Sequence, residues 1–182
     1  SEPSCIPLTG PSTMVVVSGS NSRALAVDLA VELGWEHHSI EVRRFPDSEG
    51  YIRIPDDSIT AVRSEPVVLV SNTFPDAGIV ETLLLLEALN DVRNGSLDNL
   101  REIGPQTMDP VGPGVFLAIP YFGYSRQDKR FKPGEAISAK AIGRLLSVHC
   151  DGIVVFDLHA PAALEDMPVP VSFTSAMPEI AE

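Results

Sequence analysis

The chain has 182 residues, of which 44% are hydrophobic, so it is long enough and apolar enough to bury a core of its own. Its formal net charge is -12, which argues against binding to nucleic acid or to an anionic membrane surface. A polyanionic ligand of this chain therefore needs a local cluster of cations or a metal ion.

The apolar runs are far shorter than the about 20 residues that span a bilayer, and no signal peptide opens the sequence. The two cysteines, Cys5 and Cys150, are too few for a disulfide framework and are typical of a reducing compartment. We therefore expect a cytoplasmic protein with no membrane partner.

The first part of the chain predicts a tail, a strand, a helix and a hairpin. Residues 1–13 are rich in Ser, Pro and Thr and predict a mobile tail before a domain at residues 14–182. A β-branched run predicts a strand at 14–18, and a helical pattern that Gly34 ends follows it. Two short alternating runs, at 40–42 and 51–54, predict a hairpin.

The second part alternates strands and helices around one long loop. A buried strand is expected at 67–70, and a helix at 79–93 has Asp76 as its predicted cap. Residues 94–114 collect Gly, Pro, Asn and Asp, which indicates an inserted loop. The remaining predicted elements are strands at 115–119 and 153–156, a helix at 137–148 and a final strand at 169–171.

This alternation predicts an α/β fold, a doubly wound and mainly parallel sheet flanked by helices. Ligands of such sheets bind beyond the carboxyl ends of the strands. Two polar segments, residues 121–132 and 157–159, follow predicted strands directly. We expect these segments to face one crevice.

Residues 121–132 have the sequence Tyr-Phe-Gly-Tyr-Ser-Arg-Gln-Asp-Lys-Arg-Phe-Lys. Four of the chain's 13 cations fall within residues 126–132, which we name the cationic segment. Arginine offers phosphate a bidentate donor fork and lysine a compact charge, so this segment is predicted to bind polyphosphate. A solvated basic loop is the alternative interpretation.

Asp157 and His159 are two residues apart at a strand end. If strand geometry continues through them, both side chains point the same way, which suits a metal ligand with a supporting carboxylate. A local hydrogen-bonded turn is the alternative. His37, His38 and His149 have no comparable partners and are interpreted as surface or helix-end residues.

The hairpin loop offers Phe45 for stacking and the carboxylates of Asp47 and Glu49 as acceptors for an amino group, a set that would fit a purine base. The alternative is an ordinary hairpin tip with Phe45 folded into the core. The sequence contains no Walker A motif, no Gly-x-Gly-x-x-Gly and no Gly-x-Ser-x-Gly.

Taken in order, four segments resemble the N-terminal half of ribose-phosphate diphosphokinase, also called phosphoribosyl pyrophosphate synthetase. The loop at 44–49 (Arg-Phe-Pro-Asp-Ser-Glu) is similar to the family's Arg-Phe-Pro-Asp-Gly-Glu loop, and residues 119–129 are similar to its ATP-binding signature. Residues 137–140 (Ile-Ser-Ala-Lys) and 157–159 (Asp-Leu-His) complete the set.

The resemblance implies a type I phosphoribosyltransferase-like fold and a transfer of diphosphate from Mg-ATP to ribose 5-phosphate. It implies that Phe45, Asp47 and Glu49 hold adenine across a subunit interface of a homo-oligomer. The nucleotide contacts that it implies come from Arg126, Gln127, Asp128 and Lys129. The resemblance further implies that His159 ligates or adjoins Mg²⁺ with Asp157 in support.

Three departures accompany the resemblance. Ser48 replaces a glycine in a loop that needs a positive φ. Residues 94–114 are longer than is usual in the family, and the C-terminal domain, with its flexible catalytic loop and its ribose 5-phosphate loop, is not part of this sequence. We therefore expect an ATP-side domain, acting as a fragment or with a partner chain that carries the other half. The alternatives are a non-catalytic regulatory homologue and a regulator with a phosphoribosyltransferase fold.

Overall fold

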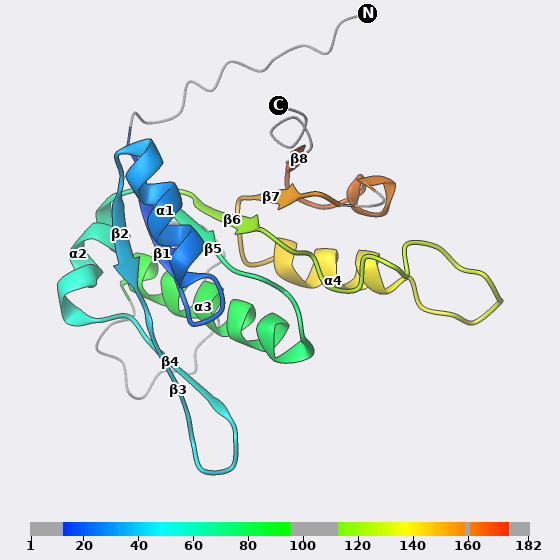
Figure 1. Cartoon of the computed structure of the whole chain (residues 1–182), viewed down its shortest axis with the longest axis horizontal. Coiled ribbons are helices and arrows are strands. Elements are labelled where there is room, and N and C mark those ends of the chain that lie inside the picture. Colours follow the sequence, from blue (N-terminus) through cyan, green and yellow to red (C-terminus); the bar gives the residue numbers. More distant parts are fainter. Residues whose placement is uncertain (1–12, 96–112, 159–160, 175–182) are drawn as a thin grey trace, which may run out of the picture.

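The computed structural model describes residues 13–95, 113–158 and 161–174 (Figure 1). The predicted tail at 1–13 lies almost wholly outside the described residues, as does most of the predicted insertion at 94–114. The strands are β1 (Val15–Ser18), β2 (Glu36–Ser39), β3 (Glu41–Arg44), β4 (Gly50–Arg53), β5 (Val67–Val70), β6 (Val115–Ile119), β7 (Gly152–Phe156) and β8 (Val171–Thr174). The helices are α1 (Arg23–Leu33), α2 (Asp56–Ser64), α3 (Asp76–Asn94), α4 (Ser138–Ser147) and the 3₁₀ turn η1 (Pro161–Leu164).

Six of the strands form one parallel sheet in the order β2-β1-β5-β6-β7-β8. Because the strands are parallel, their carboxyl ends meet at one edge. The central strands are almost wholly apolar, with valine as the commonest residue, which suits burial on both faces.

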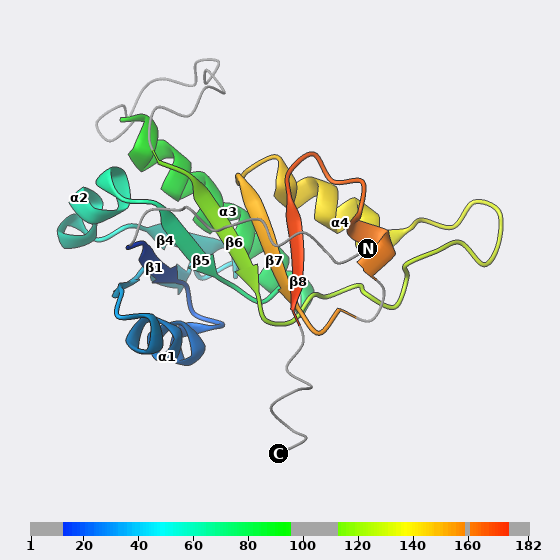
Figure 2. The same ribbon diagram turned by 90° about the horizontal axis from the view of Figure 1, so that it is seen from above.

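Helices cover both faces of this sheet. Alternate residues of each strand point to opposite sides, and apolar side chains on both sides pack against helices. On one face, α1 contributes Ala26 and Ala30 to a small cluster with Val16, Val70 and Ala118. On the other face, the neighbouring strand residues belong to a larger cluster with side chains of α2, α3 and α4. Figure 2 shows α1 on the opposite side of the sheet from α3 and α4. The prediction of a doubly wound, mainly parallel α/β fold is confirmed.

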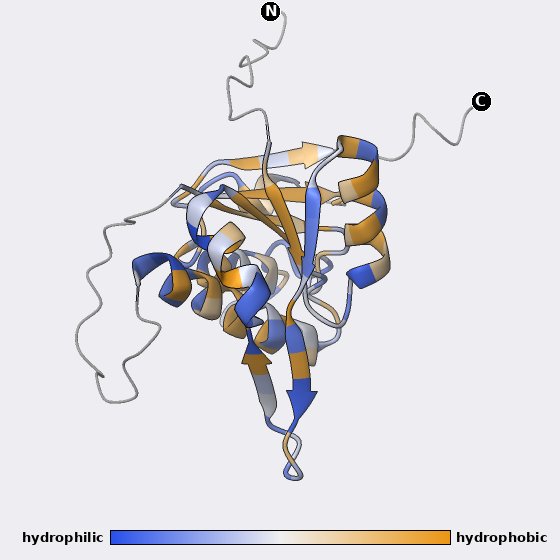
Figure 3. Ribbon diagram, turned by 90° about the vertical axis from the view of Figure 1, so that its left-hand side faces the viewer, coloured by the Kyte–Doolittle hydropathy of each residue, from blue (hydrophilic) through white to orange (hydrophobic). Residues whose placement is uncertain are grey.

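The predicted hairpin is a separate antiparallel sheet of β3 and β4, with Arg44 opposite Gly50. Its base packs against α3, and its tip projects from the body of the molecule (Figure 3). The sheet strands form the apolar interior, whereas the hairpin extends beyond it.

Two elements were not predicted, and the starts of two others differ from their predicted positions. The sequence pattern did not predict β2 or α2. His37 and His38, interpreted from the sequence as surface or helix-end residues, lie in β2. Asp76 is not the cap of α3 but its first residue, and Pro75 holds the cap position. The last strand begins at Val171, two residues after the predicted start.

The core contains the free thiol of Cys150, which donates a hydrogen bond to the Leu146 carbonyl oxygen. Burial raises the pKa of this thiol to about 12. Among the described helices, none is long and apolar enough to cross a membrane.

Leu117 lies at the centre of the sheet and is fully buried, so we expect Leu117→Ala to lower the free energy of unfolding by about 3 kcal/mol. The matched control is Val31→Ala on α1, because Val31 is 73% exposed. It should change stability by less than about 0.5 kcal/mol. Urea denaturation measures both, and equal losses would contradict the assigned core.

Candidate functional site

The sheet brings two of the predicted segments to one edge. Ile119 of β6 pairs with Val155 of β7, so the chain that follows each strand leaves the sheet on the same side. The cationic segment follows β6, and Asp157 follows β7. Both therefore leave the same edge of the sheet, and the crevice that they are expected to share stays a prediction.

Three hydrogen bonds fix the start of the loop that carries the cationic segment to the loop after β5. The Tyr121 N–H donates to Asn72 Oδ1 at 2.8 Å, and the Thr73 N–H donates to the Tyr121 carbonyl oxygen at 3.2 Å. The Gly123 N–H donates to Thr73 Oγ1 at 2.8 Å. A β-carbon at Gly123 would collide with the Thr73 carbonyl oxygen, so only glycine fits this approach.

The far part of the loop closes around Glu135. The Glu135 carboxylate accepts the N–H groups of Phe131 and Lys132 at 2.8 and 3.0 Å, and its carbonyl oxygen accepts Arg130 Nε at 2.7 Å. This carboxylate therefore accepts hydrogen bonds from the backbone. Within the described part of the chain, the side chains of Arg126, Lys129 and Lys132 form no ion pair with a carboxylate.

The cationic segment also connects to α4. The Gln127 carbonyl oxygen accepts the Ala139 N–H at 3.2 Å, and the side chain of Gln127 turns back to the Lys129 carbonyl oxygen at 3.4 Å. Asp128 is partly buried, and Arg126 is exposed. The segment thus presents its cations on a loop that is anchored at both ends.

The hairpin tip holds the predicted base-binding residues in a tight turn. The Glu49 N–H donates to Asp47 Oδ1 at 3.1 Å, and Arg44 donates to the Ser48 carbonyl oxygen at 2.8 Å. Ser48 has φ 76°, so the loop adopts the positive φ for which a glycine would be better suited.

Phe45 lies outside the core and is 41% exposed, so the alternative that folds it inward is wrong. Its ring meets Tyr51 edge to face, with 5.8 Å between the centroids. The Arg43 guanidinium lies 3.8 Å from the Tyr51 centroid and 5.3 Å from that of Phe45. This arrangement holds the Phe45 ring from one side and leaves part of it open for stacking.

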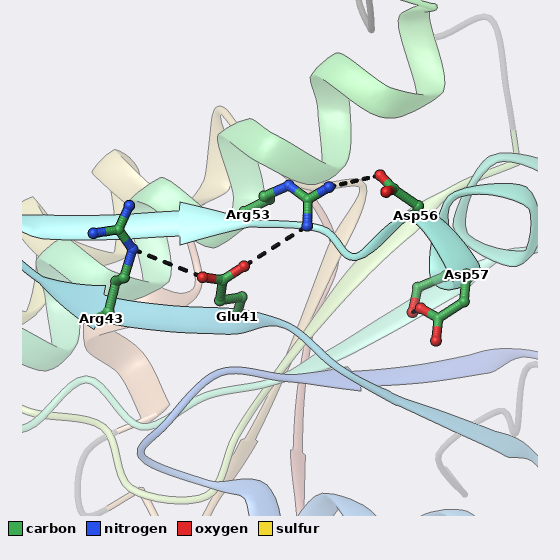
Figure 4. Close-up of polar contacts among 6 residues, drawn as sticks. Glu41, Arg43, Arg53, Asp56 and Asp57 are labelled. Carbon is green, nitrogen blue, oxygen red and sulfur yellow. Dashed lines mark hydrogen bonds and ion pairs between the residues drawn. The ribbon is translucent and has the colours of Figure 1, made fainter.

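An exposed chain of ion pairs joins the base of the hairpin to α2 (Figure 4). Arg53 lies between Asp56 at 2.7 Å and Glu41 at 3.8 Å, and Glu41 also approaches Arg43 at 3.7 Å. Exposed pairs contribute little stability, so we assign this group a local role in orienting the hairpin.

A pocket of about 460 Å³ lies between the hairpin and the first half of α3. Its lining combines apolar side chains with arginine and glutamate, and one of the predicted base-binding residues, Glu49, is among them. The lining residues are Val42, Arg43, Arg44, Ser48, Glu49, Gly50, Ile52, Ala77, Val80, Glu81 and Leu84. The sequence carried no signal for this pocket, because it depends on how the hairpin packs against a distant helix.

The condition under which Asp157 and His159 would point the same way, that strand geometry continues through Asp157, is not met. β7 ends at Phe156, and Asp157 has φ 48°, while its N–H donates to the Thr174 carbonyl oxygen at 2.9 Å. His159 lies outside the described residues. Within the described ranges, no group of three or more His, Cys, Asp or Glu could hold a metal ion.

The hairpin tip and the loop between β6 and α4 leave the body in different directions (Figures 1 and 2). One copy of the chain therefore does not bring its hairpin tip beside its own cationic segment. The two groups of predicted ATP-binding residues occupy separate places in the fold.

A family model described as the N-terminal domain of ribose phosphate pyrophosphokinase matches residues 14–96 and 114–149. A ribose-phosphate pyrophosphokinase of Methanothermobacter thermautotrophicus is 38% identical over 170 residues, which are 92% of this chain and 52% of that protein. One from Halobacterium salinarum is 30% identical over 167 residues, again 92% of this chain and 52% of that protein. The chain spans about half the length of the curated relatives it matches.

Among solved structures, the fold is similar to phosphoribosylpyrophosphate synthetase from Mycobacterium smegmatis, with a TM-score of 0.71 and 24% identity. The match covers 92% of this chain and 50% of that one. At this identity the likeness concerns the fold, which agrees with the type I phosphoribosyltransferase-like sheet implied by the sequence.

The positive φ at Ser48 leads to a stability prediction. We expect Ser48→Gly to raise the free energy of unfolding by about 1 kcal/mol. Glycine adopts a positive φ without strain, and the strain removed exceeds the extra chain entropy that a glycine loses on folding. The matched control is Ser172→Gly in β8, which should lower stability by about 0.5 kcal/mol. Urea denaturation measures both, and a loss of stability in Ser48→Gly would contradict the assigned loop conformation.

Proposed function

The chain belongs to the ribose phosphate pyrophosphokinase family, and on that premise we propose that it supplies the ATP-binding half of a ribose-phosphate diphosphokinase. In this reaction the 1-hydroxyl of ribose 5-phosphate attacks the β-phosphorus of ATP. The bond from that phosphorus to the oxygen it shares with the α-phosphate breaks, which gives AMP and 5-phosphoribosyl 1-diphosphate. The product would serve nucleotide biosynthesis.

The observation that carries this proposal is the set of cations on the loop after β6. Arg126, Lys129 and Lys132 have no carboxylate partner within the described residues, although the chain has 25 acidic residues. Cations kept out of ion pairs at the carboxyl edge of a parallel sheet suit a phosphate-bearing ligand. Diphosphate transfer depends mainly on positioning and charge stabilisation, which such a loop provides.

Separate residues would hold separate parts of the nucleotide. Arg126 would bind phosphate oxygens through its two-pronged donor group, and Lys129 would add a point charge as negative charge grows on the departing AMP. Gln127 and Asp128 would complete the contacts to the nucleotide. None of these residues needs to form a covalent bond.

Asp157 is the described residue that fits a magnesium ion. Mg²⁺ prefers oxygen ligands and is commonly held by one or two carboxylates together with phosphates of the substrate, so an exposed carboxylate at this edge suits it. His159, two residues further on, would ligate or adjoin the same ion, with Asp157 in support. When bound, the ion would neutralise charge on the transferred diphosphate.

The adenine would lie between two copies of the chain. Phe45 exposes part of its ring, and the carboxylates of Asp47 and Glu49 could accept hydrogen bonds from an amino group. The hairpin projects away from its own cationic segment, which supports a base-binding tip that reaches the cations of a second copy. The partner in this proposal is therefore a second copy of the chain in a homo-oligomer.

Arg126→Ala is expected to weaken Mg-ATP binding by about 1.5 to 3 kcal/mol, the range for a lost charge-assisted hydrogen bond. Isothermal titration calorimetry measures it, and Arg144→Ala, which removes one positive charge from α4, should leave the affinity unchanged. Failure of the unaltered chain to bind Mg-ATP would overturn the proposal and favour the regulatory homologue. If Arg126→Ala binds Mg-ATP as tightly as the unaltered chain does, the cationic segment is a solvated loop and not a phosphate site.

Phe45→Ala is expected to weaken Mg-ATP binding by about 1 to 3 kcal/mol, as for the loss of a stacked aromatic ring. The effect should appear only at protein concentrations at which copies associate, so affinity is measured against concentration with sedimentation of the same samples. The matched control is Phe173→Ala, since Phe173 on β8 is 37% exposed and Phe45 41%. Tight binding by a dilute single copy, unaffected by Phe45→Ala, would rule out the shared site.

A further inference from the structure

Asn72 connects the loops that follow three strands of the sheet. Its backbone N–H donates to Asn21 Oδ1 at 3.2 Å, and its carbonyl oxygen accepts Asn21 Nδ2 at 3.0 Å, which fixes the loop after β1. Its side-chain oxygen accepts the Tyr121 N–H, which fixes the loop after β6. The loop after β5 is therefore a rigid support for the start of the loop that carries the cations.

A second contact lies two residues before Arg126. The Tyr124 hydroxyl donates to Asp76 Oδ1 at 2.7 Å, and Asp76 is the first residue of α3. This hydrogen bond, together with a smaller effect of burial, raises the pKa of Tyr124 above its ordinary value, so the hydroxyl stays protonated and a donor at neutral pH.

Tyr124 also holds an unusual backbone conformation. Its φ is 64°, a region that bulky side chains rarely adopt and that costs free energy. Such a conformation persists where surrounding contacts determine it. Here two hydrogen bonds supply these contacts: the Gly123 N–H donates to Thr73 Oγ1 just before Tyr124, and the Tyr124 hydroxyl donates to Asp76.

Stability of the fold does not explain this arrangement. Tyr124 is 43% exposed and Asp76 is also exposed, so their hydrogen bond competes with water and adds little to folding. Its geometric effect is larger, because the backbone direction at residue 124 sets where the chain continues. The Gln127 N–H donates to the Tyr124 carbonyl oxygen, so the turn that carries Arg126 begins at Tyr124.

We propose that Asp76 and Tyr124 form a positioning pair that directs Arg126 and the cationic segment toward the phosphates of the bound nucleotide. The pair itself touches no phosphate. It acts by holding the turn at residues 124–127 in the binding conformation before the ligand arrives, which removes part of the ordering cost of binding. This inference rests on the proposed function.

The test uses the full chain and the variants Tyr124→Phe, Asp76→Ala and the double variant, with Mg-ATP affinity from calorimetry and stability from urea denaturation. Each single variant should weaken affinity by about three- to tenfold, and the double variant should weaken it no further, because both break one contact. Asp76→Asn keeps an oxygen acceptor and should stay within about twofold of the unaltered chain. Asp28→Ala, the same change on an exposed position of α1, should have no effect.

The urea midpoint of Tyr124→Phe should stay unchanged while its affinity falls, a combination that a merely structural role would not produce. Unchanged affinity in Tyr124→Phe and Asp76→Ala, in a chain whose binding still depends on Arg126, would overturn this inference and leave the proposed function intact. Additive losses in the double variant would also overturn it. A chain that binds no Mg-ATP would overturn both.

Discussion

The parallel pairing of β5, β6 and β7 is the constraint on which the candidate site depends. Leu69, Leu117 and Ile153 form one row across these strands, and none is more than 2% exposed. A slip of one residue would turn a strand's buried side chains to the opposite face, so this row fixes the register. Register in turn fixes where each strand ends, and thus which loop residues can meet. Asn72 reaches Tyr121 because β5 and β6 end side by side.

Electrostatics explain how an acidic chain can present a cationic loop. At physiological ionic strength charges are screened beyond roughly 8 Å, so the cations near a ligand matter more than the net charge of -12. The Glu135 carboxylate accepts the backbone N–H groups of Phe131 and Lys132. It shapes the loop without pairing with a cation, and the side chains of Arg126, Lys129 and Lys132 have no carboxylate partner in the part of the chain that the structure describes.

The sequence was sufficient for elements whose apolar pattern is local. The runs that became β1, β5 and β6 are short and almost wholly apolar. The pattern of α1 ends at Gly34, which adopts the left-handed conformation expected of a helix end. β2 escaped prediction because its sequence, Glu-His-His-Ser, is polar and becomes a strand only by pairing with β1. α2 is nine residues long, and its local signals are the two aspartates of its first turn and Arg63 in its last turn.

The candidate site divides in the same way. Segments rich in cations or in carboxylates beside an aromatic ring can be found from composition, so Arg126 and Phe45 could be singled out. Asp76 and Tyr124 could not, because their contact spans 48 residues of sequence and depends on the packing of two loops. The strand end at Phe156 was predicted correctly, but the turn at Asp157 was not, because its positive φ depends on how the chain leaves β7.

The separation of the hairpin from the cationic segment has a thermodynamic consequence for the proposed shared site. A nucleotide that needs both would bind only the assembled form and would stabilise it by mass action, by about 2.7 kcal/mol at a ligand concentration of 100 Kd. Assembly and nucleotide binding would then be linked, so that each would favour the other. The hairpin tip suits such a role, because the bonds from Arg44 to Ser48 and from Glu49 to Asp47 already hold its shape in one copy. A tip ordered in advance loses little entropy when a neighbour and its nucleotide meet it, so more of the contact energy remains for binding.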